Sequence, residues 1–340
     1  MRKIRLGRTN LKVSRVGIGG IPLQRPSEKE AIEVVQHALD NGINIIDTSI
    51  GYGESEIRTG KAIVGQRDDV IIITRTSVTD GKRMTEHLEK SMKQLQTDFI
   101  DIYEMHNIST AEEYDEVIAE GGSLEAMLKA KEQGKIGFLG FTSHCIETML
   151  KAVKSELFDV ILFPFNFVNN EAEEKLVPLT KKLDIGFTAM KPFAGGRLDD
   201  VNLVMKYLLQ FDNVVPVPGV EKKEEIDQIL QIVNGDWEIT STDEQKIANI
   251  RKELSDPFCQ WCGYCAPGCP QEIYMPLVIN AESMWKLWPH ESNVKRYKDI
   301  LVAAKTCTDY GECEEKCPYN LPVRDLMDEG IKFIESKLEI

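Results

Sequence analysis

The stretch Ser27-Glu-Lys-Glu30-Ala-Ile-Glu-Val-Val-Gln-His-Ala-Leu-Asp-Asn41-Gly42-Ile43-Asn-Ile-Ile46 contains the pattern that decides the fold. Ser27 followed three residues later by Glu30 forms a capping box, which predicts the start of a helix. Asn41-Gly42 predicts the end of that helix, because both residues tolerate the left-handed conformation found there. The apolar run Ile43–Ile46 has the length of a buried β-strand. One helix followed by one strand is therefore the unit from which the fold is built.

Residues 1–255 repeat this unit. Apolar runs of strand length, separated by amphipathic helical stretches, occur at Val16–Gly19, Ile43–Ile46, Val70–Ile73, Ile100–Met105, Ile136–Phe141, Val160–Phe165, Ile185–Met190 and Val214–Val217. This alternation predicts an α/β fold, a (β/α)8 TIM barrel. A doubly wound sheet is the alternative, but no G-x-G-x-x-G motif follows the first strand. Residues 5–15 are expected to form a small hairpin across the bottom of the barrel.

The charge balance limits the classes of partner. The chain has 340 residues, with 41 Lys and Arg against 55 Asp and Glu, so its net charge is −14. An acidic chain without basic runs lacks the surface that binds nucleic acid or anionic lipid, and no apolar run reaches membrane-spanning length. The N-terminus does not resemble a secretory signal. We expect a soluble, cytoplasmic protein with neither a nucleic-acid nor a membrane partner.

Seven of the eight cysteines lie in two runs near the C-terminus, Cys259-x2-Cys262-x2-Cys265-x3-Cys269-Pro270 and Cys307-x5-Cys313-x3-Cys317-Pro318. The first spacing is that of bacterial ferredoxins, in which the fourth cysteine binds a second cluster. In a large intracellular protein such spacing indicates metal rather than disulfides. Zinc is the alternative metal, although it usually pairs two CxxC motifs. Residues 256–340 are therefore predicted to be a small, mainly α-helical, ferredoxin-like iron–sulfur domain.

Polar residues, with some glycines and a proline, follow the predicted strands. They would meet at one end of the barrel, where active sites form in this fold. Singly, each has a structural explanation, such as a helix cap for Asp47 or a core histidine for His106. Four ionisable groups at one mouth would repel or stay unpaired unless they formed a network, so together they predict an active site. The residues are Gly19, Gly20, Asp47, Tyr52, Arg75, His106, Thr142, Ser143, His144, Asn166, Lys191, Pro218 and Gly219.

Several ordered segments resemble the aldo-keto reductases. Gly42-Ile-Asn-Ile-Ile-Asp47-Thr48-Ser-Ile-Gly-Tyr52-Gly53-Glu-Ser55-Glu56 is similar to the second-strand signature of that family. Later blocks match at Leu139-Gly-Phe-Thr-Ser143-His144, Phe165-Asn166, Met190-Lys191-Pro192-Phe193-Ala194-Gly195-Gly196 and Pro216-Val-Pro218-Gly219. The chain is most similar to the branch with a C-terminal ferredoxin-like dicluster segment.

The resemblance implies hydride transfer between a nicotinamide and a small carbonyl or alcohol substrate. Tyr52 would be the general acid, tuned by Asp47 and a cation, and His106 would orient the substrate. A nearby cation lowers the pKa of tyrosine from its usual value of about 10. The family has Lys where this chain has Arg75, and a guanidinium is bulkier and places its charge differently.

The resemblance also implies which residues contact the cofactor, NADP(H) or NAD(H). They are Gly19, Gly20, Asp47, Ser143, His144, Asn166, Lys191, Phe193, Pro218, Gly219 and Lys222. Lys222 and Lys223 would bind a 2′-phosphate, although a solvated helix face explains them equally well. Leu162 replaces the family's Gln beside the nicotinamide, and Ile229 replaces an Asn further along.

Interleaved ligation assigns one 4Fe-4S cluster to Cys259, Cys262, Cys265 and Cys317. Cys269, Cys307 and Cys313 remain for the second, and by the resembling pattern Tyr310 occupies the position of its missing cysteine. The second site would then hold a 3Fe-4S cluster, or a 4Fe-4S cluster whose fourth iron takes Asp309, Tyr310, a water or a substrate, or no cluster at all.

Three functions fit these observations. The first is an oxidoreductase whose barrel binds NAD(P)H and whose clusters exchange electrons with a partner protein, a flavin or the substrate. The second is a plain carbonyl reductase whose clusters only stabilise the tail. The third is a redox sensor or electron-transfer protein on a barrel with impaired hydride chemistry, which the presence of Arg75 favours.

Overall fold

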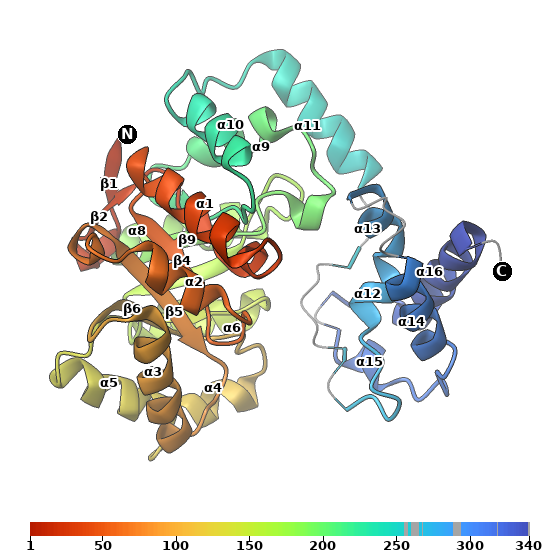
Figure 1. The fold of residues 1–340 in the computed structure, drawn as a ribbon, viewed down its shortest axis with the longest axis horizontal. Helices are drawn as coiled ribbons and strands as arrows, with labels where there is room; N and C mark the ends of the chain where they lie inside the picture. The colour runs from red at the N-terminus through yellow and green to blue at the C-terminus, as the bar shows by residue number, and fades with distance from the viewer. Residues whose placement is uncertain (255–257, 260–264, 267, 288–293, 318, 339–340) are drawn as a thin grey trace. The chain divides into compact units, whose positions relative to one another are not determined.

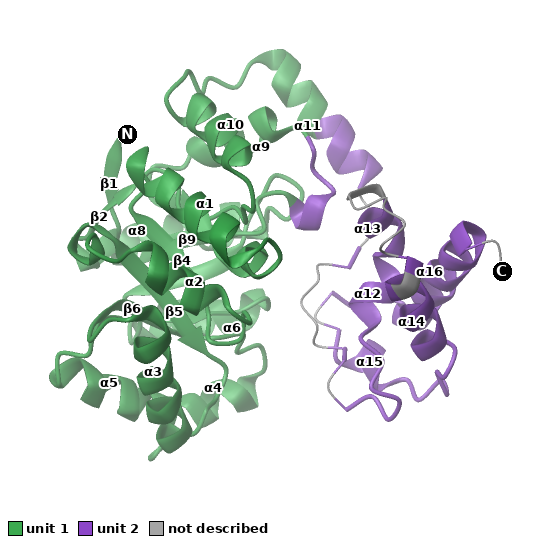
Figure 2. Ribbon diagram, in the orientation of Figure 1, with its two compact units in different colours: residues 1–193, 200–247 green, residues 194–199, 248–340 purple. Residues whose placement is uncertain are grey.

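The computed structural model describes residues 1–254, 258–259, 265–266, 268–287, 294–317 and 319–338. The chain forms two compact units, shown in different colours in Figure 2. The first comprises Met1–Phe193 and Asp200–Ile247, and the second Ala194–Asp199 and Ala248–Ile340. The predicted boundary between residues 255 and 256 lies outside the described residues and stays a prediction. In the described part of the chain, no helix is both long enough and apolar enough to cross a membrane.

Eight parallel strands form the sheet of the first unit, in the order β10-β9-β8-β7-β6-β5-β4-β3. The first strand also bonds to the last, because Gly17 N donates to Pro216 O at 2.9 Å and Gly19 forms a parallel bridge with Gly219. The predicted barrel is confirmed, and the doubly wound alternative is wrong. The strands are β3 Ile18–Gly19, β4 Ile45–Asp47, β5 Ile71–Thr76, β6 Ile100–Met105, β7 Ile136–Thr142, β8 Val160–Pro164, β9 Gly186–Met190 and β10 Val214–Pro216.

Helices surround these strands, as Figure 1 shows for α1 to α6. The predicted capping box is present, since Ser27 Oγ accepts from Glu30 N at 3.3 Å and Ser27 N donates to the Glu30 carboxylate at 2.9 Å. Asn41 caps the C-terminus of this helix, followed by Gly42 with φ of 87°. The helices are α1 Glu28–Asp40, α2 Ser55–Ala62, α3 Gly81–Leu95, α4 Ala111–Ile118, α5 Ser123–Glu132, α6 Ile146–Ser155, α7 Glu171–Lys175, α8 Val177–Leu183, α9 Val201–Leu209, α10 Lys223–Val233 and α11 Ser241–Glu253.

An antiparallel hairpin precedes the barrel, with β1 at Lys3–Arg5 and β2 at Lys12–Ser14. Its side chains Leu6 and Val13 are buried in one apolar cluster with residues of five barrel strands, Val160 among them. The predicted hairpin is therefore confirmed, although it begins two residues earlier than expected.

Gly7 makes the contact between this hairpin and the barrel possible. Its φ is +51°, and a Cβ there would lie 2.2 Å from Gly186 N and 2.5 Å from Ile185 C. We expect Gly7→Ala to lower the free energy of unfolding by about 1–2 kcal/mol for the left-handed backbone and roughly 1–3 kcal/mol more for the clash. Gly65→Ala is the matched control, because Gly65 has φ of +82° with no atom within 4 Å of its Cβ. Denaturant titrations that give equal losses for both variants would exclude the clash.

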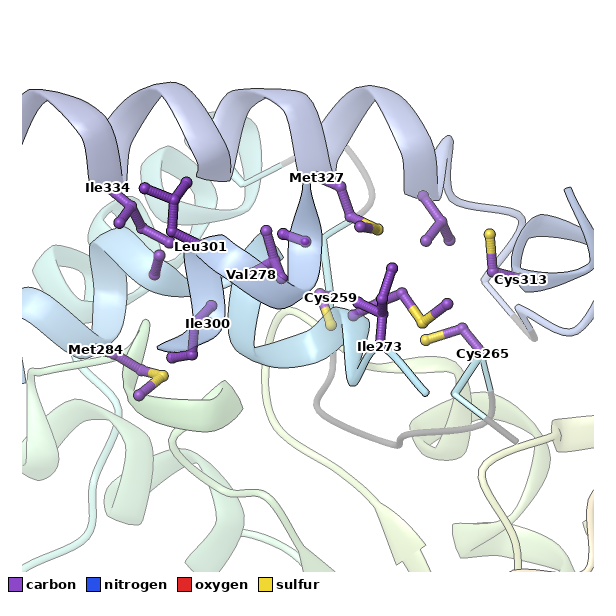
Figure 3. Close-up of a cluster of buried hydrophobic side chains, with 14 of the residues drawn as sticks. Cys259, Cys265, Ile273, Val278, Met284, Ile300, Leu301, Cys313, Met327 and Ile334 are labelled. Carbon is purple, nitrogen blue, oxygen red and sulfur yellow. The ribbon is translucent and has the colours of Figure 1, made fainter. Parts of the chain in front are cut away.

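The second unit is helical, with its apolar core drawn in Figure 3. Val278, Ile300, Met327 and Ile334 lie in this core, and Gly330 brings α16 against α12, because a Cβ there would lie 2.1 Å from Val278 O. The mainly α-helical character predicted for residues 256–340 is confirmed in the described residues. The helices are α12 Met275–Ile279, α13 Ala281–Leu287, α14 Val294–Ala304, α15 Glu312–Glu315 and α16 Val323–Leu338.

Candidate functional site

Asp47, Tyr52 and Arg75 come together at the C-terminal ends of β4 and β5. Asp47 is the last residue of β4, Arg75 is the fifth residue of β5, and Tyr52 lies in the turn between β4 and α2. The buried Arg75 guanidinium donates through Nη2 to Asp47 Oδ2, and its charge acts on the buried Tyr52 phenol. The three residues that sequence spacing placed at this rim therefore interact.

The pKa of Tyr52 is higher than its usual value, mainly because the phenol is buried. Arg75 lowers the pKa, as the sequence analysis expected from a neighbouring cation, but the carboxylates of Asp47 and Glu104 raise it again. The expected effect of the cation is present, but burial and two negative charges outweigh one guanidinium, so the net change in the pKa is upward. Tyr52 therefore stays protonated at neutral pH and is suited to donate a proton.

His106 follows β6 directly and lies beside Tyr52. The two rings meet edge to face, with centroids 5.7 Å apart and planes at 83°. His106 Nδ1 lies 3.4 Å from Ser49 Oγ, and the His106 backbone N donates to Thr76 O at 2.8 Å. Burial, with a smaller effect of Arg75, lowers the pKa of His106 to about 3. The imidazole is therefore neutral at physiological pH and keeps one N–H donor.

Glu104 is a member of the site that the sequence analysis missed. It lies in β6 and pairs with Arg75 in the strand register. Glu104 Oε2 is 3.2 Å from Arg75 Nε, and both side chains are fully buried. The available signal was a single acidic residue inside the otherwise apolar end of the run Ile100–Met105.

The expected cofactor residues after β7 to β9 lie at the same end of the barrel, but several are already engaged. Asn166 Nδ2 donates to Lys191 O at 2.9 Å, and Asn166 Oδ1 accepts from two backbone amides. His144 Nδ1 lies 2.8 Å from Asn107 Oδ1, and Ser143 Oγ accepts from Cys145 N at 3.0 Å. Burial, Lys191 and other nearby cations lower the pKa of His144, so its ring is neutral. The Asn166 amide thus supports the loop that follows β8.

The remaining cofactor candidates include residues that close the barrel. Gly19 N donates to Pro218 O and Gly20 N to Asp47 O, both at 2.7 Å, while Gly219 pairs with Gly19. Phe193 is partly buried beyond β9 and Leu162 is fully buried in β8.

Of the two lysines expected near a 2′-phosphate, only one is in an ion pair within the described residues. Lys223 Nζ binds Glu33 at 2.8 Å and thereby joins α10 to α1. Lys222 is exposed at the N-cap of α10, where its backbone N donates to Glu225 Oε2 at 3.2 Å, and its ammonium is in no ion pair among the described residues. Lys222 is therefore the better candidate of the two.

The C-terminal cysteines lie in the core of the second unit. Cys259, Cys265, Cys313 and Cys317 are 5–8% exposed, Cys269 is half-buried and Cys307 is exposed. Figure 3 labels Cys259, Cys265 and Cys313 in this core, the first two near Ile273. Every described cysteine is outside a disulfide, and in this part of the chain no three Cys, His, Asp or Glu side chains converge on one metal position. Cys262 lies outside the described residues. Several cysteine side chains outside disulfides in one apolar core fit an iron–sulfur cluster in donor type.

Family profiles match both parts of the chain. The profile of the Aldo/keto reductase family matches residues 15–203, and that of the 4Fe-4S dicluster domain matches residues 258–322. The resemblance drawn from the sequence is confirmed, including its C-terminal iron–sulfur segment.

Individual relatives agree with the profiles. Aldo-keto reductase YhdN of Bacillus subtilis is 34% identical over 192 residues, which are 51% of this chain and 56% of that protein. This chain thus spans little more than half the length of that relative.

Solved structures are also similar. The holo form of aldo-keto reductase AKR11C1 from Bacillus halodurans has a TM-score of 0.64 at 23% identity, covering 74% of this chain and 96% of that one. An aldo-keto reductase from Klebsiella pneumoniae in complex with NADPH has a TM-score of 0.64 at 20% identity. The match covers 74% of this chain and 95% of that one. These two structures share the barrel fold.

Proposed function

Because this chain belongs to the aldo/keto reductase family, we propose that its barrel uses NAD(P)H to reduce a small carbonyl compound, or oxidises the corresponding alcohol. We also propose that its iron–sulfur segment exchanges electrons with a partner protein, a flavin or the substrate. The observation that carries the first proposal is the buried Tyr52 phenol, within the electrostatic influence of a guanidinium that Asp47 holds, with His106 beside it. A cytoplasmic location is part of the proposal, because thiols persist in reducing compartments.

The chain's own residues would act on the carbonyl oxygen. A bound nicotinamide would supply the hydride. Tyr52 would donate its proton to the oxygen as negative charge develops there, and its raised pKa keeps that proton available. The neutral His106 would donate a hydrogen bond to the same oxygen and orient the substrate. Arg75 would stabilise the resulting tyrosinate, and Asp47 would hold Arg75 in place.

The proposed nicotinamide contacts are those of the sequence analysis, with Lys222 as the candidate for a 2′-phosphate. Support for NADP(H) comes from the Klebsiella relative, which binds NADPH on the same fold. The use of the Asn166 amide by its own loop argues against a direct contact between that side chain and the cofactor.

The proposed cluster ligands are the seven cysteines from Cys259 to Cys317, with two clusters. When bound, iron–sulfur clusters would supply one-electron transfer, whereas a nicotinamide supplies a two-electron hydride. Some group must therefore accept the pair and release single electrons. The burial of four cysteines in the core of the second unit also supports a purely structural role for the metal, which is the second candidate function.

Anaerobic mixing separates these functions. Under the first proposal, NADPH with a carbonyl probe such as 4-nitrobenzaldehyde is consumed, and NADPH bleaches the cluster absorbance once an electron acceptor or free flavin is present. Consumption of NADPH with unchanged cluster absorbance under every condition would establish a plain reductase. Failure of both NADPH and NADH to bind, measured by nicotinamide fluorescence, would contradict both enzyme proposals and leave a redox sensor or electron carrier.

A further inference from the structure

Glu104 is a buried carboxylate to which the proposed mechanism assigns no role. It lies inside β6, where the strand register places Arg75 on one side and Gly140 of β7 on the other. Side-chain exposure is 0% for Glu104 and 1% for Arg75. The carboxylate thus belongs to the same layer of the barrel as the candidate catalytic cation.

The surroundings of Glu104 make this carboxylate costly to keep. A buried carboxylate without compensation costs several kcal/mol, and an apolar residue of similar size is often at least as stable. In the part of the chain that the structure describes, neither oxygen of Glu104 accepts a hydrogen bond and Arg75 Nε has no hydrogen-bond partner, so the compensation is an ion pair with Nε 3.2 Å from Oε2. Burial raises the pKa of Glu104, and the charge of Arg75 opposes this rise. Stability of the barrel alone therefore gives no reason for a carboxylate at this position.

Gly140 provides the space that Glu104 occupies. A Cβ at Gly140 would lie 2.5 Å from Glu104 Cγ and 2.9 Å from Glu104 Oε1. Any larger residue at this position of β7 would push the carboxylate away from its present place. Arg75, Glu104 and Gly140 therefore form a matched set across three neighbouring strands.

The contacts of Arg75 indicate what this set does. A guanidinium is planar and carries donors on different edges, so a single carboxylate leaves part of it unfixed. Asp47 binds Arg75 at Nη2, while Glu104 faces Nε. Two carboxylates on different nitrogens restrict the orientation of the guanidinium plane. An ammonium is a point charge and needs no such second partner.

We propose that Glu104 is a positioning residue that holds Arg75 at Nε, so that this guanidinium presents Nη2 to Asp47 and keeps its charge near Tyr52. The inference deepens the proposed carbonyl reduction and rests on it for its catalytic consequence. It predicts that the cation and the carboxylate act as one unit, and that a shorter cation can replace Arg75 only when Glu104 is also removed.

A double-mutant cycle tests this unit with NADPH and 4-nitrobenzaldehyde. Displacement of catalytic groups by about 1 Å costs about 10²-fold in rate, so we expect Glu104→Leu and Arg75→Lys each to lower kcat by roughly 10–100-fold with little change in KM. The kcat of the double variant should be at least about tenfold higher than that of the poorer single variant, because the effects of substitutions at interacting residues are not additive. Losses that simply add in the double variant would overturn the proposal.

The Nε–H signal of Arg75 in ¹⁵N NMR spectra gives a readout that does not depend on activity. The signal is assigned by its disappearance in Arg75→Lys, and it should shift and exchange faster with solvent in Glu104→Gln, which keeps the side-chain volume. Gly140→Ala crowds Glu104 but keeps its carboxyl group. This variant should change the Arg75 Nε–H signal in the same direction as Glu104→Gln. An unchanged signal in both variants would refute the contact. A changed signal in a protein without reductase activity would support the contact and contradict the proposed function.

Glu56→Gln is the matched control. Glu56 is another buried barrel glutamate, but it accepts from Thr74 Oγ1 at 2.5 Å and lies on α2. We expect this variant to lose stability while the Arg75 signal and kcat stay as in the unmodified protein. Equal effects of Glu56→Gln and Glu104→Gln on the Arg75 signal would show a general response to buried charge and would overturn the positioning role.

Discussion

Replacement of Tyr52 by phenylalanine should lower kcat for carbonyl reduction by about 10²–10⁴-fold, the usual contribution of a general acid. The phenol is buried with a raised pKa, is influenced by the charge of Arg75 and lies against the His106 ring, so it is the described group best suited to give a proton to the carbonyl oxygen. The variant removes one hydroxyl and leaves the ring packing in place. NADPH binding should therefore be nearly unchanged, which single-turnover and fluorescence measurements can separate from the loss of rate.

Tyr114→Phe is the control for this experiment. Tyr114 is a buried tyrosine on α4 whose ring packs edge to face on Phe141, away from the candidate catalytic residues. This variant should retain full activity. A Tyr52→Phe protein that reduces 4-nitrobenzaldehyde at the unmodified rate would rule out Tyr52 as the acid.

Replacement of Cys265 by alanine should remove about four irons per chain from anaerobically purified protein, the content of one 4Fe-4S cluster. Under the proposed ligand assignment the unmodified protein holds roughly seven or eight irons, according to whether the second cluster is 3Fe-4S or 4Fe-4S. Iron and sulfide analysis measures the iron content of the variant and of the unmodified protein. Electron paramagnetic resonance after reduction shows which cluster types are present. Four irons in the unmodified protein would eliminate the second cluster.

The same substitution should also destabilise the second unit. Cys265 is buried in the core that α12, α14 and α16 share, and metal–ligand bonds contribute directly to folding free energy. Each kcal/mol lost lowers the melting temperature of a unit of this size by about 4–8 °C. Cys145→Ala is the control, because Cys145 lies at the start of α6 in the first unit and should affect neither iron content nor this transition. Equal iron content in both variants would contradict the ligand assignment.

The arrangement of the barrel was predictable because its signals are local. The capping box at Ser27, the stop at Asn41-Gly42 and the eight apolar runs each depend on residues close in sequence. The Asp47-to-Tyr52 spacing was informative for the same reason, since one strand end and one turn carry both residues. The cysteine runs are equally local, and their spacing identified the iron–sulfur segment that the family profile matches.

The properties that depend on distant residues could not be predicted. The effect of the cation on the pKa of Tyr52 could be expected, but burial and Glu104, which raise this pKa, could not be read from sequence. Lys223 fitted a 2′-phosphate contact and a solvated helix face equally well, and Glu33, far away in the sequence, binds it. Asn166 was expected at the cofactor, and its amide bonds Lys191 O and two backbone amides of its own loop.

The amino-acid sequence by itself therefore determined the barrel, the iron–sulfur segment and the residue types at the strand ends, because periodicity, caps and spacing act over a few residues. Only the tertiary structure decided which of those residues touch and what charge they carry. Strand register brings Glu104 to Arg75 and leaves room at Gly140. Burial then sets the protonation of Tyr52 and His106. Both effects arise only when strands from distant parts of the chain lie side by side and exclude water.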